Sequence, residues 1–349
     1  MRLGVLDIGS NSAQLQIVEA TAGAPPLPVH AVKAATRLGE SIGADQRLDE
    51  DGIDRIGRAV ADTLAAAHRY EVDEIYLFVT AAIRDAANRD EILDRIGSEC
   101  GMRPQFLTGL QEARLTYLAV HRWYGWRAGR LLDIDIGGGS MEIALGRDAV
   151  PELAVSLPLG ADRLTRGFFD ADPPPRKQVK ALRRYVRDTL RETADRLRWE
   201  GEPQLVVATS KTFKQLARLA GAPSQRKGPF VRRTLSRRKI HAWVPRLAAV
   251  PAERRAALQG VSPSRAGQIL AGAIVADETL CALDVPAVQV SPWALREGVM
   301  LHYLSTVTDP RDELPLHPLR PLTPTAPTTG ATVTALPASV TSHASTRGQ

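Results

Sequence analysis

The sequence predicts an α/β protein of two domains, and three observations support this prediction. A short motif occurs twice, as D-I-G-S-N-S at residues 7–12 and as D-I-G-G-G-S at residues 135–140. In both halves, strand-like runs alternate with stretches whose apolar residues recur at helical spacing. The length of 349 residues suits two domains with ample cores. We therefore expect domains over 1–125 and 126–305, followed by a tail over 306–349.

Each copy of the motif stands between two strand-like runs. Residues 3–6 and 15–18 flank the first copy, and residues 131–136 and 143–145 flank the second. This pattern predicts two β-hairpins with tight turns of Gly and Ser. Glycine lets the backbone approach a ligand closely, and turn N–H groups bind anions. Two such turns facing each other would form a clamp for phosphate and a divalent cation, which the leading Asp would hold.

The remaining elements follow from the periodicity of apolar residues. In the first half we expect helices over 52–70, 81–87, 89–98 and 112–122, and strands over 74–80 and 104–107. In the second half we expect helices over 175–197, 211–219, 268–283 and 295–304, and strands over 204–209 and 287–291. This alternation places one α/β unit after each hairpin.

Positive charge is concentrated in the second half of the chain. The net charge is +6, and residues 226–239 contain seven basic residues and no acidic residue. Such a run is typical of a solvated, flexible loop. It would equally serve as an electrostatic funnel for a polyanion, so both interpretations stay open. Only Phe230 and Trp243 lie nearby to stack on bases, which disfavours a specific nucleic-acid site.

Cysteine content and hydropathy favour a cytoplasmic protein. Cys100 and Cys281 are the two cysteines, and neither belongs to a CxxC pair, which disfavours a disulfide framework or a zinc site. The apolar run at the start ends at Asp7 and is too short for a signal peptide. No apolar stretch approaches the roughly 18 residues that a membrane span needs. From residue 306 onward, recurring Pro followed by Thr, Ser and Ala predicts a disordered tail, with a short binding motif as the alternative.

Six segments, in the same order, resemble the exopolyphosphatase and guanosine pentaphosphate phosphohydrolase family. They are D-I-G-S-N-S from Asp7, T-A-A-I-R-D-A from Thr80, T-G-L-Q-E-A-R-L from Thr108, D-I-G-G-G-S-M-E from Asp135, S-L-P-L-G-A-D-R-L-T from Ser156 and R-E-G-V from Arg296. The family shares the fold of actin, sugar kinases and the heat-shock-70 ATPase. The resemblance therefore implies two actin-like (ribonuclease H-like) domains with an interdomain cleft.

The resemblance also implies a role for each matching residue. Glu112 would orient and deprotonate the attacking water, Arg84 would contact the terminal phosphate, and Glu142 would help to position the water. Mg²⁺ is the implied cofactor, with Asp7, Asp135 and Glu142 as its ligands. The implied phosphate clamp consists of Gly9, Ser10, Asn11, Ser12, Gly137, Gly138, Gly139 and Ser140.

Taken without the family, each of these residues has a structural alternative. Glu112 could be a surface helix residue, Arg84 a salt-bridge partner at a helix end, and Glu142 an exposed strand residue. Asp133 lies two residues before Asp135 on the same strand face and could be mistaken for it. A further alternative makes Arg296 and Glu297 a structural ion pair.

The chain departs from the family pattern at three places, one of which is Met141, where Thr is common. Gln111 replaces an acid often found before the catalytic Glu. Residues 208–213 read A-T-S-K-T-F where many relatives have a Gly-rich turn, which seats adenosine in ATP-using cousins. Lys211 brings a cation there, which suits an extra phosphate better than a purine. A structural Lys at a helix start is the alternative.

We therefore expect an exopolyphosphatase that releases orthophosphate from the end of inorganic polyphosphate by direct attack of water. Phosphoanhydride hydrolysis needs cations on the non-bridging oxygens and a carboxylate that holds the water. The longest family members carry further C-terminal helical domains, whereas the matching sequence here stops near Leu304, so short chains are the expected substrate. A guanosine pentaphosphate (pppGpp) 5′-phosphohydrolase is the alternative, and a kinase or ATPase is disfavoured. The family suggests a homodimer.

Overall fold

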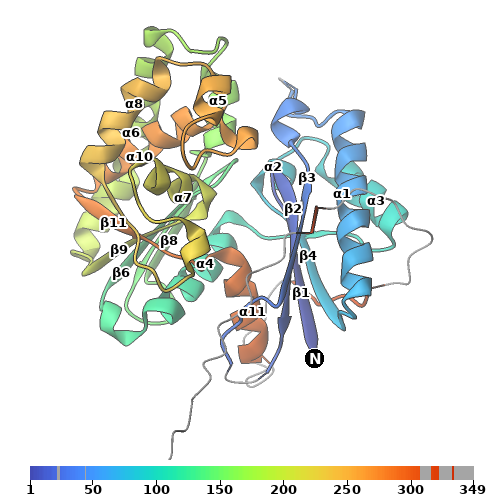
Figure 1. The fold of residues 1–349 in the computed structure, drawn as a ribbon. Helices are drawn as coiled ribbons and strands as arrows, with labels where there is room; N and C mark the ends of the chain where they lie inside the picture. The colour runs from blue at the N-terminus through green and yellow to red at the C-terminus, as the bar shows by residue number, and fades with distance from the viewer. Residues whose placement is uncertain (22–23, 44, 307–315, 322–331, 334–349) are drawn as a thin grey trace, which may run out of the picture.

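The strands of this protein form two sheets, each at the centre of its own lobe (Figure 1). The computed structural model describes residues 1–21, 24–43, 45–306, 316–321 and 332–333. Within them both sheets are six-stranded, and helices cover their faces, which confirms the predicted α/β class. The first sheet contains β1 (Arg2–Ile8), β2 (Ser12–Glu19), β3 (His30–Ala35), β4 (Glu74–Val79), β5 (Gln105–Phe106) and β12 (Thr332–Val333). The second contains β6 (Leu131–Ile136), β7 (Met141–Gly146), β8 (Leu153–Leu157), β9 (Leu205–Thr209), β10 (Thr234–Ser236) and β11 (Ala287–Val290).

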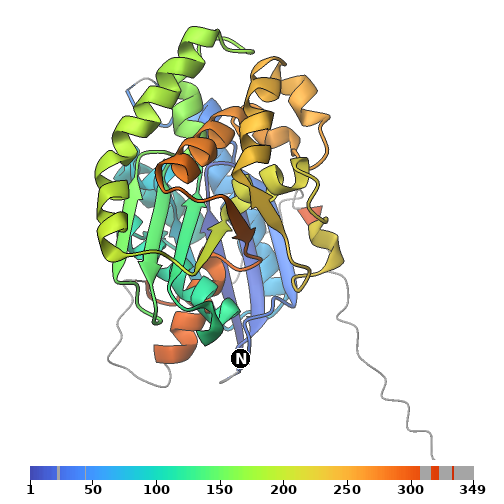
Figure 2. The same cartoon turned by 90° about the vertical axis from the view of Figure 1, so that its left-hand side faces the viewer.

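The two sheets share one topology. In the first, β1, β2 and β3 form an antiparallel meander, while β4 and β5 continue parallel to β1 on its other side. In the second, β6, β7 and β8 form the meander, while β9 and β11 continue parallel to β6. The repeated motif therefore joins the first two strands of the meander in each lobe. Figure 2 shows the second sheet lying in front of the first.

Eleven α-helices lie among the described residues, and most flank the sheets. In the first lobe they are α1 (Glu50–Arg69), α2 (Ala81–Arg84), α3 (Arg89–Cys100) and α4 (Gly109–Tyr124). They continue with α5 (Ala161–Phe168), α6 (Arg176–Glu200), α7 (Ser210–Leu219), α8 (Arg237–Ala248), α9 (Ala252–Ala256), α10 (Ile269–Ala282) and α11 (Leu295–Thr306). Each helix and strand that the sequence predicts is present, although the expected helix over 81–87 contains only the short α2. The strands β3, β8 and β10 and the helices α5, α8 and α9 were not predicted.

Helix α4 lies between the two sheets, at the junction of the lobes (Figure 1). Its Leu115 packs with Leu3 and Val5 of β1, and its Tyr117 and Val120 pack with β6, β7 and β9. Alternation along a strand sends successive side chains to opposite faces. Asp7 therefore shares the α4-facing side of β1 with Val5, and Asp135 shares the α4-facing side of β6 with Leu131. Both motif carboxylates thus project toward the junction.

The end of the chain returns to the first lobe. Helix α11 packs on α4 and β1, with Val299 and Met300 in one cluster with Leu3 and Phe78. Residues 295–305 therefore lie with the first sheet, whereas the expected domain boundary placed them in the second domain. The approach of α11 to α4 is so close that a Cβ on Gly298 would lie 2.0 Å from the carbonyl oxygen of Leu115.

The expectation of disorder does not hold for residues 316–321 of the tail. Leu316 is buried beside Phe78, and the backbones of Leu319 and Ile75 exchange two hydrogen bonds of 2.8 Å. Apolar side chains within the Pro-rich stretch explain this packing, because they extend the core next to the short strand β5. Most of the predicted tail lies outside the described residues.

The basic stretch over 226–239 is folded. It contains a short 3₁₀ helix (Gln225–Lys227), strand β10 and the start of α8. Arg233 is buried, and its guanidinium donates to the carbonyls of Pro223, Ser224, Gly228 and Val231 at 2.7–3.1 Å. For Arg233, therefore, neither the solvated loop nor the polyanion funnel is correct. Arg232 and Arg238 remain exposed.

Two further findings concern the cysteines and the helices. Cys100 and Cys281 are both free thiols, and Cys100 lies 3.8 Å from the carbonyl oxygen of Gly57. No helix in the described part of the chain combines the length and apolar character that a bilayer crossing demands.

Candidate active site

The two hairpin turns close in the same way. The N–H of Gly9 donates to the carbonyl of Ser12 at 3.1 Å, and the N–H of Gly137 donates to that of Ser140 at 2.9 Å. Ser10, Asn11, Ser12 and Ser140 are buried. The predicted hairpins are therefore confirmed, with Ile8 opposite Ala13 and Ile136 opposite Met141.

The turns face each other across the junction of the lobes. A Cβ on Gly138 would lie 2.1 Å from Ser10 Oγ, and a Cβ on Gly139 would lie 2.7 Å from the Cβ of Ala81. Gln268 also donates from the second lobe to Asn11 Oδ1 at 3.0 Å. Only residues without a side chain permit this approach, which gives a physical reason for the glycines of the second turn.

Helix α5 holds the second turn in place. The N–H groups of Ala161, Asp162 and Arg163 in its first turn donate to the carbonyls of Gly137 and Gly138 at 2.9–3.0 Å. These donors have no partner inside their own helix, so the carbonyls of the second turn satisfy them. The turn is thereby fixed with its carbonyls toward α5.

Glu112 lies in the first turn of α4, and its position is set by the helix cap. Thr108 and Gln111 form a reciprocal capping box, in which the Thr108 side chain accepts from the Gln111 N–H and the Gln111 side chain accepts from the Thr108 N–H. This cap gives Gln111, the departure from the family pattern, a structural role. Glu112 is 5% exposed, so it is not a surface helix residue. Its Oε1 is buried without a hydrogen-bond partner among the described residues.

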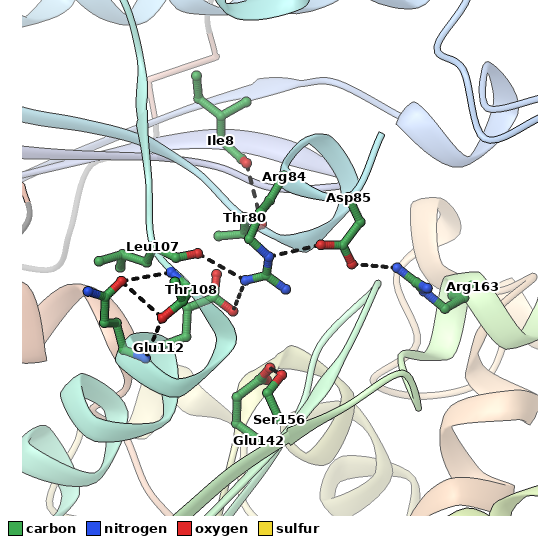
Figure 3. Close-up of polar contacts among 11 residues, drawn as sticks. Ile8, Thr80, Arg84, Asp85, Leu107, Thr108, Glu112, Glu142, Ser156 and Arg163 are labelled. Atoms are coloured by element: carbon green, nitrogen blue, oxygen red, sulfur yellow. Dashed lines mark hydrogen bonds and ion pairs between the residues drawn. The ribbon is translucent and has the colours of Figure 1, made fainter. Parts of the chain in front are cut away.

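Arg84 lies at the end of α2 and reaches Glu112 (Figure 3). Its Nη1 is 3.2 Å from Glu112 Oε2 and 3.1 Å from the carbonyl oxygen of Leu107, and its Nε is 2.9 Å from Asp85 Oδ1. Its Nη2 has no hydrogen-bond partner among the residues that the structure describes. Arg84 therefore does form ion pairs at the end of a helix, as the structural alternative states, and one of its two acidic partners is the buried Glu112.

Glu142 lies on β7, directly opposite Asp135 of β6, and is 7% exposed. It is therefore not an exposed strand residue. Ser156 Oγ donates to Glu142 Oε1 at 2.8 Å. Burial, together with the charge of Asp135, raises the pKa of Glu142 to about 7. Burial and the charge of Glu142 also raise the pKa of Glu112, while Arg84 opposes that rise.

The two motif carboxylates complete an acidic group. Burial raises the pKa of both Asp7 and Asp135, and the charge of Asp7 adds to the rise at Asp135. Asp7 Oδ1 is buried without a hydrogen-bond partner in the described structure, whereas its Oδ2 lies 3.5 Å from Arg296 Nη1. Asp133 is deeper on the same face of β6, 3% exposed, with Thr209 Oγ1 at 3.4 Å from its Oδ1.

These carboxylates fit a divalent cation that water and substrate help to hold better than a metal held by protein alone. Among the described residues, no group of three or more His, Cys, Asp and Glu side chains is placed to hold a metal ion. Mg²⁺ usually takes only one or two carboxylates and completes its shell with water and substrate phosphate. The unpartnered oxygen of Asp7 and the raised pKa values of Asp7 and Asp135 indicate buried charge that a cation would neutralise.

Cations surround the acidic group. Lys211, at the start of α7, is desolvated and lies among like charges, which lowers its pKa to about 8. Those like charges are Lys214, Lys33, Arg265 and Arg296. Arg265 also interacts with Asp162, Asp135 and Asp7, and its side chain has no hydrogen-bond partner in the described residues. No sequence motif marks Arg265, because only the fold brings the segment before α10 to this place.

Arg296 and Glu297 do not pair with each other. Arg296 donates to Gln14 Oε1 at 2.7 Å and lies near Asp7, while Glu297 accepts from the N–H of Ala294 at 2.8 Å at the start of α11. The expected structural ion pair is therefore wrong. Arg296 instead links the last helix to the first phosphate loop.

Comparisons with known proteins agree with this arrangement. A profile of the Ppx/GppA phosphatase family matches residues 16–307. Exopolyphosphatase 1 of Mycobacterium tuberculosis H37Rv is 46% identical over 312 residues, which cover 88% of this chain and 90% of that protein. Exopolyphosphatase 1 of Mycobacterium leprae is 42% identical over 309 residues, which cover 88% and 91%.

Solved structures extend the likeness to the fold. A Ppx/GppA family member from Aquifex aeolicus aligns with a TM-score of 0.71 and 28% identity, covering 90% of this chain and 99% of that one. An exopolyphosphatase from Cytophaga hutchinsonii aligns with a TM-score of 0.79 over 87% and 98% of the two chains; at 24% identity it supports the fold alone. The two lobes are thus the actin-like domains that the sequence predicts. With its profile match over 16–307 and its identity to two exopolyphosphatases, the chain belongs to the Ppx/GppA phosphatase family.

Proposed function

We propose that this protein is an exopolyphosphatase that hydrolyses the terminal phosphoanhydride bond of inorganic polyphosphate and releases orthophosphate. One observation carries the proposal: a buried carboxylate, Glu112, is paired with Arg84 beside two glycine turns that meet from opposite lobes. The names of the mycobacterial relatives support polyphosphate as the substrate.

In the proposed reaction, water attacks the terminal phosphorus directly. Glu112 orients this water and accepts its proton, for which its unpartnered Oε1 is suited. Arg84 keeps Nη2 for a phosphate oxygen, since its other nitrogens are occupied by Asp85, Glu112 and Leu107. Glu142, held by Ser156, accepts a second hydrogen bond from the water. Negative charge on the non-bridging phosphate oxygens is thereby stabilised by hydrogen-bond donors, such as Arg84, that are already oriented before the substrate binds.

We assign Mg²⁺ to Asp7 and Asp135, with water and substrate oxygens completing its shell, because the expected third ligand, Glu142, does not complete a group of three side chains placed to hold a metal among the described residues. When bound, it would neutralise charge on the phosphate oxygens. The turn residues Gly9, Ser10, Asn11, Ser12, Gly137, Gly138, Gly139 and Ser140 would hold the terminal phosphates through N–H and hydroxyl groups. Lys211 and Arg265 would bind the phosphates that follow, because Arg265 interacts with Asp135 and Asp7 and also with Lys211.

Short chains are the preferred substrate in this proposal. Among the described residues, Lys211 lies near four other cations, Lys33, Lys214, Arg265 and Arg296, and Arg84 adds a sixth at Glu112, so the positive charge gathered here suits a chain of few phosphates. Arg233 cannot extend this group, because four carbonyls already occupy its guanidinium. We further propose, from the family resemblance, a cytoplasmic homodimer, for which the molar mass in solution is the test.

The experiment compares phosphate release from short polyphosphate, long polyphosphate, guanosine pentaphosphate and ATP under the same conditions. Short polyphosphate should give the highest kcat/KM, and long chains should lose only a few phosphates per encounter. Glu112→Gln should lower kcat by about 10²–10⁴-fold while polyphosphate binding persists. A preference for guanosine pentaphosphate would replace the proposal with the alternative, and an active Glu112→Gln variant would refute the mechanism.

A further inference from the structure

An ion pair joins the two lobes beside the site. Arg163 of α5, in the second lobe, donates from Nη2 to Oδ2 of Asp85, which follows α2 in the first lobe, at 2.5 Å (Figure 3). Their side chains are 33% and 37% exposed, so the pair is partly shielded from water. An exposed pair of this kind would stabilise the fold little. Its position suggests another role.

Both ends of this pair connect to the site. Asp85 Oδ1 accepts from Arg84 Nε at 2.9 Å, and Arg84 Nη1 is 3.2 Å from Glu112 Oε2. At the other end, the backbone N–H of Arg163 donates to the carbonyl of Gly138 at 3.0 Å. A continuous series of contacts therefore runs from the second phosphate loop, across the lobes, to Glu112.

The guanidinium of Arg84 is oriented from both sides. Asp85 binds its Nε edge, while Glu112 and the Leu107 carbonyl bind Nη1. The planar guanidinium cannot rotate without breaking one of these contacts. Its unpaired nitrogen, Nη2, therefore keeps one fixed orientation. Without Asp85, Arg84 could turn to give Glu112 a two-pronged grip, which would withdraw Nη2 from the substrate. The carboxylate of Asp85 prevents that turn.

The surroundings of the pair show that the lobes are closed there. The interdomain pocket that contains Asp85 and Arg163 has a volume of about 10 Å³, no more than one water occupies. Ala81 and Gly139 line it from the two lobes. Separation of the lobes would open this pocket and break the 2.5 Å contact. The contact can therefore form only when the second phosphate loop lies against the first lobe.

We propose that Asp85 and Arg163 are positioning residues, which direct Nη2 of Arg84 to the terminal phosphate once the lobes have closed. This inference rests on the proposed function, since it concerns the group that Arg84 contacts in that reaction. Neither residue touches the substrate. Their contribution is to couple the orientation of Arg84 to the placement of the second phosphate loop.

The test measures kcat and KM for short polyphosphate in Asp85→Asn and Arg163→Gln. We expect kcat to fall about tenfold in each, with KM changed less than about twofold, because the cations around Lys211 still hold the chain. Arg163→Lys should recover part of the rate, since it keeps the charge but not the geometry of the fork. The double variant should lose no more than Asp85→Asn alone, because that substitution already breaks the contact that Arg163→Gln removes.

The decisive measurement repeats both substitutions in an Arg84→Ala background. If the pair acts through Arg84, neither substitution lowers the remaining kcat there. If the pair only holds the lobes together, both substitutions still lower kcat in the Arg84→Ala background, and the inference is wrong. Arg103→Gln is the matched control, because its 2.7 Å pair with Asp94 lies on the surface of the first lobe and should leave kcat unchanged.

Two other results would also be informative. Unchanged kcat in Asp85→Asn and Arg163→Gln, with an active parent enzyme, would overturn this inference alone. A parent enzyme that releases no phosphate from polyphosphate would refute the proposed function first. Melting temperatures of all variants, measured alongside, should stay close to that of the parent, because a partly exposed pair contributes little to stability.

Discussion

Glu112 Oε2 lies 3.2 Å from Arg84 Nη1, and both side chains are nearly excluded from water. A buried pair of this kind leaves each partner with one unused atom, Oε1 on the carboxylate and Nη2 on the guanidinium. The pair also joins two segments of the first lobe, α2 and α4, that the second phosphate loop approaches from the other side. In the proposed reaction, Oε1 of Glu112 would contact the attacking water and Nη2 of Arg84 would contact the neighbouring phosphate.

The first prediction concerns pH and Lys211. With a pKa of about 8, Lys211 carries its charge below that pH and loses it as the pH rises through 8. KM for short polyphosphate should therefore rise above pH 8 in the parent enzyme. In Lys211→Arg, whose side chain stays charged, the rise should flatten. Initial rates between pH 6.5 and about 9.5 test this, and identical profiles would remove Lys211 from the phosphate site.

The second prediction distinguishes Asp135 from Asp133, which share one face of β6. Asp135→Asn should raise the Mg²⁺ concentration needed for half-maximal rate by about tenfold or more, because it removes a ligand charge. Asp133→Asn should leave that concentration unchanged, since Asp133 contacts Thr209 within the lobe. Titration of activity with Mg²⁺ provides the measurement. An equal effect of both substitutions would contradict the assignment.

A third prediction follows from the contact between the turns. Gly138→Ala adds a Cβ 2.1 Å from Ser10 Oγ, so the turns must separate or Ser10 must rotate. We expect kcat/KM to fall at least about tenfold, equivalent to about 1.4 kcal/mol. Gly167→Ala is the control, because nothing lies within 4 Å of the added atom. That variant should keep full activity and gain up to about 1 kcal/mol of stability, as Ala replaces Gly in a helix.

The fourth prediction separates two neighbouring arginines of the basic stretch. Arg233→Met leaves four carbonyls without their donor and should lower the free energy of unfolding by about 3 kcal/mol. Arg232→Met, at an exposed position, should leave stability within about 0.5 kcal/mol. Urea unfolding measures both changes. Comparable stability of the two variants would show that the carbonyls find other donors.

Much of the architecture could be predicted because it depends on local patterns. The hairpins followed from apolar runs around Gly-rich turns, and α1 and α6 from long helical periodicity. Short elements escaped prediction: β3 reads H-A-V-K-A-A with Val32 as its one large apolar residue, and α5 is only eight residues long. These elements depend on tertiary packing more than on propensity.

The site was predictable only where a motif marked it. Glu112, Arg84, Asp135 and Glu142 stand in recognisable segments, and the fold brings them together. Arg265 lies outside these segments, and its position depends on the segment before α10. Arg163 stands in the segment from Ser156, but only the fold shows that α5 brings it to Asp85. The closing helix was assigned to the wrong lobe for the same reason, since sequence order does not reveal that α11 packs on β1.

Because α4 packs on both sheets, the carboxylate at its first turn belongs to neither half of the molecule alone. Cutting the chain before or after α4 would strip one apolar flank of this helix, whichever half kept it, so the halves should not fold separately in soluble form. Gly298 strengthens the dependence, because backbone meets backbone where α11 crosses α4. The two matching sheets are therefore not separate folding units, because a single helix, α4, packs on both of them.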